Sequence, residues 1–258
     1  MKDKSTEKKT FDNIENLSLT MEVGFSDYSA LVFDEVKNQC VFSESFSFTS
    51  FNDFEEKTSL IGFNFREVKI YLFTPDFTLV PNALTENGNL TDFLHLACGE
   101  KKHASVRYDV MNTINATITY YADEKLLSFF SKHFSNAQFF HSATKFISEH
   151  KQSDDLSLNI HLYNNHFMVC YFKNKALQFA NGFEYNHFND LIYLLLFTTK
   201  SLNLTPSETT INISGHFNPN VEQHILKYFK TTVHSEKTIS NLELKQELLP
   251  RFSLLVNH

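Results

Sequence analysis

Two stretches of this chain carry the same alternation of apolar and polar residues. The first, LSLTMEVGFSDYSALVFDEVKNQCVFSESFSFTSFND, begins at Leu17, and the second, LSLNIHLYNNHFMVCYFKNKALQFANGFEYNHFND, begins at Leu156. Each contains three alternating runs and then Phe-Asn-Asp, where a helix is expected to begin. The second copy is two residues shorter, which a tighter turn explains. Self-similarity over such a long period indicates a duplicated structural unit.

The first copy predicts three strands followed by a helix. Alternation with a period of two favours strands at 17–23, 28–34 and 40–48, with turns at 24–27 and 36–38. A helix capped by Ser50, with Asp53 in its first turn, is expected next. Its apolar stripe would be Phe51, Phe54 and Ile61. The run VKIYLF at 68–73 is apolar enough for a strand that is covered on both faces.

Residues 75–121 have no counterpart in the second copy, so we expect an insertion subdomain in the first lobe. It should hold a helix at 90–97 and strands at 106–111 and 116–121. Beyond it, Asp123 should start a helix with the apolar face Leu126, Leu127, Phe130 and Phe134, followed by a buried strand at 137–140 and a helix at 142–150. Residues 1–13 are polar and aperiodic, which predicts a disordered tail. The first lobe would then span 14–150.

The second lobe would span 151–258, after the polar linker KQSDD. Strands are expected at 156–163, 166–172, 176–183, 210–214 and 231–235. The helix at 188–202 is apolar almost all round, which predicts burial. A helix capped by Asn218, with Pro219 at its first position, should bury Val221, Ile225 and Tyr228. A last helix is expected at 241–249.

Each half therefore has the order of three antiparallel strands, helix, strand, helix, strand and helix. This order, used twice, is similar to the duplicated ribonuclease-H-like unit of actin-like proteins, an α/β fold with two lobes and mixed five-stranded sheets. The chain also resembles an uncharacterised bacterial family described as having an actin-like ATPase fold. The resemblance is carried by FTLVPNALT (77–85), YADEKLLSFFSKHFSNAQFFHS (121–142) and FEYNHFNDLIYLLLF (183–197).

Composition narrows the function classes. The net charge of −7 and the pI of about 5.9 argue against a nucleic-acid surface, which needs a basic face. Three widely spaced cysteines, Cys40, Cys98 and Cys170, favour reduced thiols. The polar start has no apolar signal segment, and no run reaches the roughly 20 apolar residues of a membrane helix. These features predict a cytoplasmic protein without membrane insertion.

The resemblance implies a nucleotide site in the cleft between lobes, with an acid-x-Gly turn in each lobe. The first turn fits in part, with Glu22, Gly24 and Ser26, and Gly215 is a single glycine where the fold usually has a pair near adenosine. The second turn, at 163–166, has neither acid nor glycine. We therefore regard Glu22, Gly24, Ser26 and Gly215 as candidate cofactor-binding residues for ATP and Mg²⁺. An acid such as Asp155 opposite Glu22 would favour an enzyme.

Other chemistry is less well supported by the sequence. A ribonuclease-H-type nuclease needs several carboxylates around two metals, and Glu22 is the one obvious acid on the first strand. His95, Cys98 and His103, with Asp92 nearby, could hold a metal, but without a paired-cysteine motif a buried cysteine beside two surface histidines is the preferred interpretation. His161 and His166 are expected on opposite faces, and Cys170 in the core. The run DLIYLLLF (190–197) is interpreted as a packing helix, and a partner helix is the alternative.

Two functional hypotheses remain. The preferred one is a degenerate, non-hydrolysing actin-like scaffold that binds protein partners and needs no cofactor, because the whole fold is kept while the second-lobe turn has lost its motif. The alternative is an ATP-binding enzyme or switch with the nucleotide between the lobes. A Gly24 with positive φ in a hairpin turn is the simplest structural explanation of the first motif.

Overall fold

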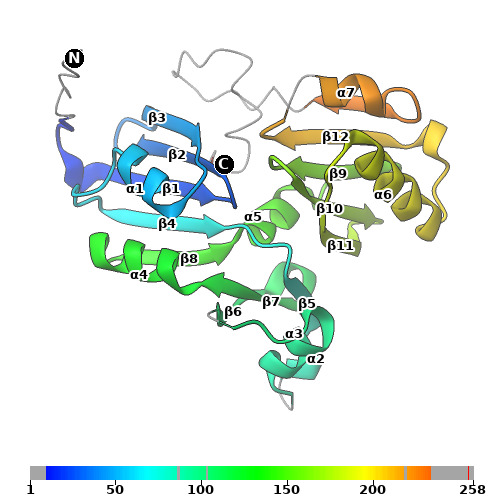
Figure 1. The fold of residues 1–258 in the computed structure, drawn as a ribbon, viewed down its shortest axis with the longest axis horizontal. Coiled ribbons are helices and arrows are strands. Elements are labelled where there is room, and N and C mark those ends of the chain that lie inside the picture. Colours follow the sequence, from blue (N-terminus) through cyan, green and yellow to red (C-terminus); the bar gives the residue numbers. More distant parts are fainter. Residues whose placement is uncertain (1–9, 86–87, 103, 218–219, 234–254, 256–258) are drawn as a thin grey trace.

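The computed structural model describes residues 10–85, 88–102, 104–217, 220–233 and 255, which form two lobes and a smaller sheet (Figure 1). The first lobe is built on a five-stranded sheet of order β3-β2-β1-β4-β8. Its strands are β1 (Leu17–Val23), β2 (Asp27–Asp34), β3 (Gln39–Ser47), β4 (Glu67–Leu72) and β8 (Ala137–His141). The first three are antiparallel neighbours, whereas β4 pairs in parallel with both β1 and β8.

The second lobe repeats this order as β11-β10-β9-β12-β13. Its strands are β9 (Ser157–Leu162), β10 (His166–Lys173), β11 (Ala176–Glu184), β12 (Thr210–Gly215) and β13 (Lys230–Val233). The pairing directions also repeat, with β9, β10 and β11 antiparallel and β12 parallel to β9 and β13. The prediction of two ribonuclease-H-like lobes with mixed five-stranded sheets is confirmed.

A three-stranded antiparallel sheet of order β5-β7-β6 lies beneath the first lobe in Figure 1. Its elements are β5 (Phe77–Pro81), α2 (Asn82–Thr85), α3 (Leu90–Cys98), β6 (Ala104–Met111) and β7 (Ala116–Asp123). The remaining described helices are α1 (Phe51–Lys57), α4 (Glu124–His133), α5 (Ser142–Glu149), α6 (Phe188–Ser201) and α7 (Asn220–Ile225), with short 3-10 turns at Ile14–Asn16, Asn112–Ile114 and Pro206–Glu208.

Helix starts follow the side chains that satisfy free backbone N–H groups. The Ser50 hydroxyl accepts from the Asp53 amide at 3.2 Å, so α1 begins at Phe51. The Asp123 carboxylate accepts from the amides of Lys125 at 2.7 Å and Leu126 at 3.1 Å, so α4 begins at Glu124. Both starts were predicted, because a capping side chain is readable from the sequence.

Several first-lobe details differ from the prediction. Residues 1–9 of the predicted tail lie outside the described residues, but Phe11 packs edge-on against Phe63 with ring centroids 4.9 Å apart. Helix α1 ends at Lys57, before Ile61, because the chain turns extended at Thr58. Burial alternates along β4, so only one of its faces is fully covered. Strand β8 is only partly buried because it is an edge strand of its sheet.

In the second lobe, α6 is not buried all round. The Tyr193 and Phe197 side chains are 66% and 56% exposed, because α6 packs on the sheet along one side only. Tyr228 is also exposed, since α7 ends at Ile225 and the chain turns. The predicted cap at Asn218 and Pro219 and the helix at 241–249 lie outside the described residues.

Strand β10 is buried on both faces and separates two apolar clusters. Phe167, Val169 and Tyr171 pack in a cluster confined to the second lobe. Met168, Cys170 and Phe172 point the other way and join the first-lobe core, together with Phe146 and Ile147 of α5. The two lobes therefore share one apolar core across their boundary. No helix in the described part of the chain is both long and apolar enough to cross a bilayer.

Candidate functional site

The boundary between the lobes is where several strands end or begin: β1, β9 and β12 end there, and β2 and β10 begin there. Glu22, near the end of β1, is buried there with 5% of its surface exposed. The Tyr163 hydroxyl, from the second lobe, donates to Glu22 Oε1 at 2.7 Å. His161 Nε2 lies 3.4 Å from Glu22 Oε2. Both carboxylate oxygens of the first-lobe acid are thus contacted by side chains of the other lobe.

Burial and the Glu22 charge act together on Tyr163. Burial disfavours the charged phenolate, and the neighbouring carboxylate adds to this effect, so the pKa of Tyr163 is raised well above its ordinary value. The hydroxyl therefore stays protonated and keeps its role as donor. A charge-assisted hydrogen bond of this kind is stronger than a neutral one, particularly where water is excluded.

His161 is held from behind by β12. Its Nδ1 lies 2.9 Å from the Ser214 hydroxyl, which in turn donates to the Ile160 carbonyl at 3.2 Å. This arrangement follows from the parallel pairing of β9 with β12, in which Ser214 stands beside His161. The ring is fully buried and its orientation toward Glu22 is fixed.

The Tyr163 ring fills the space beside Gly24. It stacks on Phe73 with centroids 3.8 Å apart and an interplanar angle of 12°. A Cβ added to Gly24 would lie only 3.2 Å from Tyr163 Cδ1. The expectation that Gly24 needs a positive φ is wrong, because Gly24 is not among the glycines in that region. Its small size is needed for the close approach of Tyr163.

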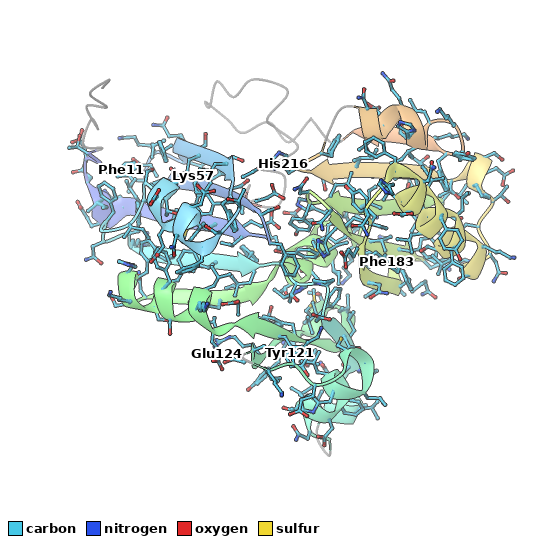
Figure 2. The ribbon with its side chains drawn as sticks, viewed as in Figure 1. Phe11, Lys57, Tyr121, Glu124, Phe183 and His216 are labelled. Atoms are coloured by element: carbon cyan, nitrogen blue, oxygen red, sulfur yellow. The ribbon has the colours of Figure 1, made fainter. Side chains whose placement is uncertain are left out.

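Asp27, at the start of β2, makes a second link between the lobes. Its Oδ2 accepts from the Asn164 amide at 3.0 Å, while Oδ1 accepts from Ser47 at 3.0 Å and lies 2.9 Å from His216 Nδ1. Burial alone would raise the pKa of Asp27. The hydrogen bond and charge of His216, with the donors Asn164 and Ser47, outweigh burial and lower that pKa. Figure 2 shows His216 at the boundary between the lobes.

The two remaining predicted site residues have structural surroundings of their own. The Ser26 hydroxyl lies 3.4 Å from Asp27 Oδ2 and accepts from Asn164 Nδ2 at 3.5 Å. Gly215 has φ +96°, and a Cβ there would overlap the Leu162 carbonyl oxygen and lie 2.7 Å from the Leu162 nitrogen. Gly215 is thus required where β12 passes close to β9. Asp155, which precedes β9, does not reach Glu22, since its carboxylate accepts from the Asn174 amide at 2.7 Å.

A pocket of about 580 Å³ lies beside this junction. The first lobe contributes Asp27 and Ser47 to its lining, and the second lobe contributes Asn164, Tyr185, Asn186, His187, Phe188, His216, Phe217 and Val221. Among the described residues, its lining contains one carboxylate, two imidazoles and no lysine or arginine. The side chains around it therefore favour polar, weakly charged groups over a triphosphate, which needs several cations or backbone amides.

The metal hypothesis gains no support from the described residues. Among them, no group of three or more His, Cys, Asp or Glu is arranged to hold an ion. The His95 ring is nearly parallel to that of Tyr121, with centroids 6.2 Å apart, and the Cys98 thiol lies 3.8 Å from the Phe77 carbonyl oxygen. His103 lies outside the described residues. Cys170 is buried in the core, as predicted, and burial raises the pKa of its thiol well above the ordinary value.

The prediction that His161 and His166 point to opposite faces is wrong. The His166 ring stacks on Phe25 at 4.6 Å, so both imidazoles face the first lobe. The reason is that the chain turns between β9 and β10, which places both residues on the same side of the paired strands. Sequence reasoning also missed Asp27, Tyr163 and His216. For Tyr163 the internal repeat held a signal, because aligning Leu17 with Leu156 places Gly24 over Tyr163, and likewise Glu22 over His161.

Comparisons with known proteins agree with this architecture. A family model described as "Protein of unknown function (DUF3822)" matches residues 6–231. A protein from Bacteroides thetaiotaomicron with an actin-like ATPase fold and unknown function is 15% identical, with 96% of this chain and 100% of that chain covered and a TM-score of 0.77. The PilM–PilN type IV pilus biogenesis complex contains a chain that is 9% identical, with 92% and 96% covered and a TM-score of 0.52.

A third solved structure is the activator of the 2-hydroxyisocaproyl-CoA dehydratase from Clostridium difficile with bound ADPNP. It is 7% identical, with 92% of this chain and 91% of that chain covered and a TM-score of 0.41. No curated protein sequence matches the chain. The extent of the family match, together with the duplicated sheet order, shows that this chain belongs to the family of unknown function DUF3822 and has the actin-like ATPase fold.

Proposed function

We propose that this chain is a non-hydrolysing actin-like protein that acts as a scaffold and binds protein partners. The observation that carries the proposal is the occupation of Glu22 by Tyr163 and His161 of the opposite lobe. An acid that serves a metal or an attacking water must reach them, and this carboxylate already has a partner at each oxygen. The space beside Gly24, where phosphates would approach the backbone, is filled by the Tyr163 ring.

The shared core supports the same conclusion. Met168, Cys170 and Phe172 of β10 pack into the first-lobe core, and their side chains are almost completely buried. A hinge motion that separated the lobes would expose this apolar surface to water, at about 25 cal/mol for each Å². A cleft that opens and closes around a nucleotide is therefore disfavoured, and a rigid two-lobed body is favoured.

A partner-binding role also fits a structural neighbour. The PilM–PilN complex, by its name, is an assembly of two proteins in type IV pilus biogenesis, and one of its chains shares this fold. Similarity of fold does not transfer a partner. It does support the idea that an actin-like body can work by holding another protein.

The second candidate is an ATP-binding enzyme or switch, in which Glu22, Gly24 and Ser26 face Gly215. The observation in its favour is the pocket of about 580 Å³ that lies between the lobes next to His216. The residues present do not fit a Mg²⁺-triphosphate. The described part of the pocket lining offers no lysine or arginine, and Asp27 already has partners in His216, Ser47 and the Asn164 amide.

The test is a thermal-shift titration of the whole protein with Mg-ATP, Mg-ADP and buffer alone, followed by a phosphate-release assay. A ligand at 100 times its Kd stabilises by about 2.7 kcal/mol, which corresponds to a shift of roughly 5–10 °C in a chain of this size. We expect no shift at millimolar nucleotide and no released phosphate. A clear shift that Asn186→Ala reduces, with Asn189→Ala on the outer surface as control, would favour the second candidate and overturn the first.

A further inference from the structure

Helices α6 and α7 of the second lobe form an exposed aromatic surface. Four of the twelve exposed large apolar side chains among the described residues lie here: Tyr193, Phe197, Leu226 and Tyr228, with exposures of 66%, 56%, 52% and 48%. Of the other eight, three lie in the first lobe, one in the second, and four in the insertion, on α2, α3 and β6. Because isolated apolar side chains are normal on a surface and clustered ones are not, this concentration points to an interaction surface.

The two helices enclose a groove of about 280 Å³. They contact one another, and Phe188 of α6 stacks on His224 of α7 with centroids 4.8 Å apart. The groove is lined by Asn189, Ile192, Tyr193, Leu196, His224, Lys227 and Tyr228. Tyr193 and Phe197 lie one turn apart on α6, nearly parallel at 6.3 Å. We call these lining residues, with Phe197 and Lys200, the α6–α7 groove.

The groove lies away from the junction between the lobes. Along β10, the side chains that pack toward α6 and α7 alternate with those that pack toward the first lobe. The helices therefore cover the face of the second sheet opposite to the first lobe, as Figure 1 also shows. A partner bound in the groove would leave the Glu22 and Asp27 links untouched.

The free charges beside the groove are basic, because the nearby acid of α6, Asp190, caps its own helix and accepts from the amides of Asn186 at 3.1 Å and His187 at 2.9 Å. Lys227 and His224 belong to its lining, which contains no carboxylate among the described residues, and Lys200 follows Phe197 by three residues on the same side of α6. The nearest acid of α7, Glu222, accepts from the Thr231 hydroxyl at 3.3 Å. The whole chain carries a net charge of −7, so this apolar groove with lysines stands out from an otherwise acidic protein.

The walls also limit the shape of what can bind. Among the described residues they are α6, α7 and the turn that follows α7, none of which is a strand, so they offer no sheet edge to which a strand could be added. An apolar groove between helices accepts an amphipathic helix through side chains at i, i+3, i+4 and i+7. Tyrosine is also the residue type that most often dominates binding energy at such surfaces, together with tryptophan and arginine.

We propose that the α6–α7 groove is the partner-docking site of this protein, and that it takes an amphipathic helix whose apolar stripe is flanked by aspartate and glutamate. The proposal rests on the partner-binding function and specifies its surface. Tyr193, Phe197 and Tyr228 contact the apolar stripe, and Lys200 and Lys227 contact the flanking carboxylates. This docking site would give the apolar run at 190–197 a second role besides packing.

The experiment uses two synthetic helical peptides of about 18 residues, long enough to hold a helix. They share one stripe of Leu and Phe and differ only in flanks of Glu or Lys. Fluorescence anisotropy with the full chain measures their affinities at low salt, where exposed charges act most strongly. We expect the Glu-flanked peptide to bind about tenfold more tightly than the Lys-flanked peptide.

Surface variants test whether the peptides bind in the α6–α7 groove. Tyr193→Ala with Phe197→Ala should weaken the Glu-flanked peptide by about tenfold or more. Lys200→Glu with Lys227→Glu should reverse the preference between the peptides. The control Tyr108→Ala with Val110→Ala removes two equally exposed side chains on β6 and should change nothing. All positions are exposed, so the variants should keep the melting temperature of the parent.

Equal affinity for the two peptides, no binding of either at about 0.1 mM, or loss of binding in the β6 control alone would overturn the proposal. These outcomes are independent of the nucleotide titration. A nucleotide-dependent shift would overturn the non-hydrolysing scaffold while leaving a peptide result intact. A failed peptide assay without a nucleotide shift would reject this groove and leave the scaffold function standing.

Discussion

The first and second lobes are built to one plan, but they place opposite chemistry at matching positions. The strands β1 and β9 occupy the same central position in their sheets. Where β1 carries Glu22 and is followed by Gly24, β9 carries His161 and is followed by Tyr163. The acid of one copy faces the imidazole of the other, and the smallest residue faces the largest ring.

This difference shows how two copies of one plan can be joined by complementary side chains at matching positions. Two facing carboxylates would repel one another and would need a cation between them. A carboxylate facing a tyrosine and a histidine forms direct contacts that hold the lobes together. The sheet order depends on the apolar alternation, which both copies keep, so the site could change while the fold did not.

The largest effect is expected where β12 passes closest to β9. Gly215→Ala should destabilise the protein by about 4 kcal/mol, because the new Cβ meets the Leu162 backbone and φ is +96°. The matched control is Gly62→Ala, where φ is +90° but nothing lies within 4 Å. It should cost about 1 kcal/mol. Urea denaturation measures both, and equal losses would show that strain alone, without the close approach, accounts for Gly215.

Making the two lobes chemically alike at this position should destabilise their junction. His161→Glu would place a second carboxylate beside the buried Glu22, with an expected cost of about 4 kcal/mol. His161→Gln, a neutral residue with a hydrogen-bonding amide, should cost less than half as much. The thermal midpoints of the two variants at neutral pH measure these two losses of stability. If they coincide, the charge of Glu22 has no part in the contact.

Acid should weaken the first lobe through His141, which has no counterpart in the junction. Burial lowers the pKa of His141 to about 4, below the ordinary 6.5. The neutral ring accepts from the Ala143 amide at 3.0 Å and contacts the Thr74 carbonyl oxygen at 2.9 Å. Between these pH values the unfolded chain binds the proton and the folded chain does not. Stability should fall by about 3 kcal/mol from pH 7 to pH 4.

The control for this pH effect is His141→Gln, which cannot titrate but can still donate and accept. Its free energy of unfolding, measured by urea denaturation at each pH, should fall less steeply over the same range than that of the parent. Parallel curves for the two proteins would assign the acid sensitivity to other groups.

The smallest of these effects tests a single hydroxyl at the junction. Tyr163→Phe keeps the ring stacked on Phe73 but removes the donor to Glu22 at 2.7 Å, and should cost about 2 kcal/mol because a buried carboxylate loses its partner. Tyr185→Phe is the control. Its hydroxyl donates to the neutral Tyr163 carbonyl at 3.2 Å, so its loss should cost about 1 kcal/mol. A Tyr163 variant no weaker than the control would argue against a charge-assisted bond.

The strands, their order and most helix starts could be predicted from the sequence, because period-two alternation and capping residues act over a few neighbouring positions. The site was predictable only in part. Glu22 was recognised as the first-lobe acid, and it does lie at the boundary between lobes. The reason given for Gly24 was wrong, since its constraint comes from a ring 139 residues further along the chain.

The sequence alone thus determined a duplicated α/β chain with one partial acid-x-Gly turn and no matching turn in the second copy. The tertiary structure was needed to show that Tyr163 and His161 contact Glu22, that His216 contacts Asp27, and that Tyr193 and Phe197 remain exposed. The reason is the distance along the chain over which each interaction acts. Alternation and caps are properties of adjacent residues, whereas these contacts depend on how the two sheets pack against each other. That packing is determined by the buried area and the charges of the whole molecule.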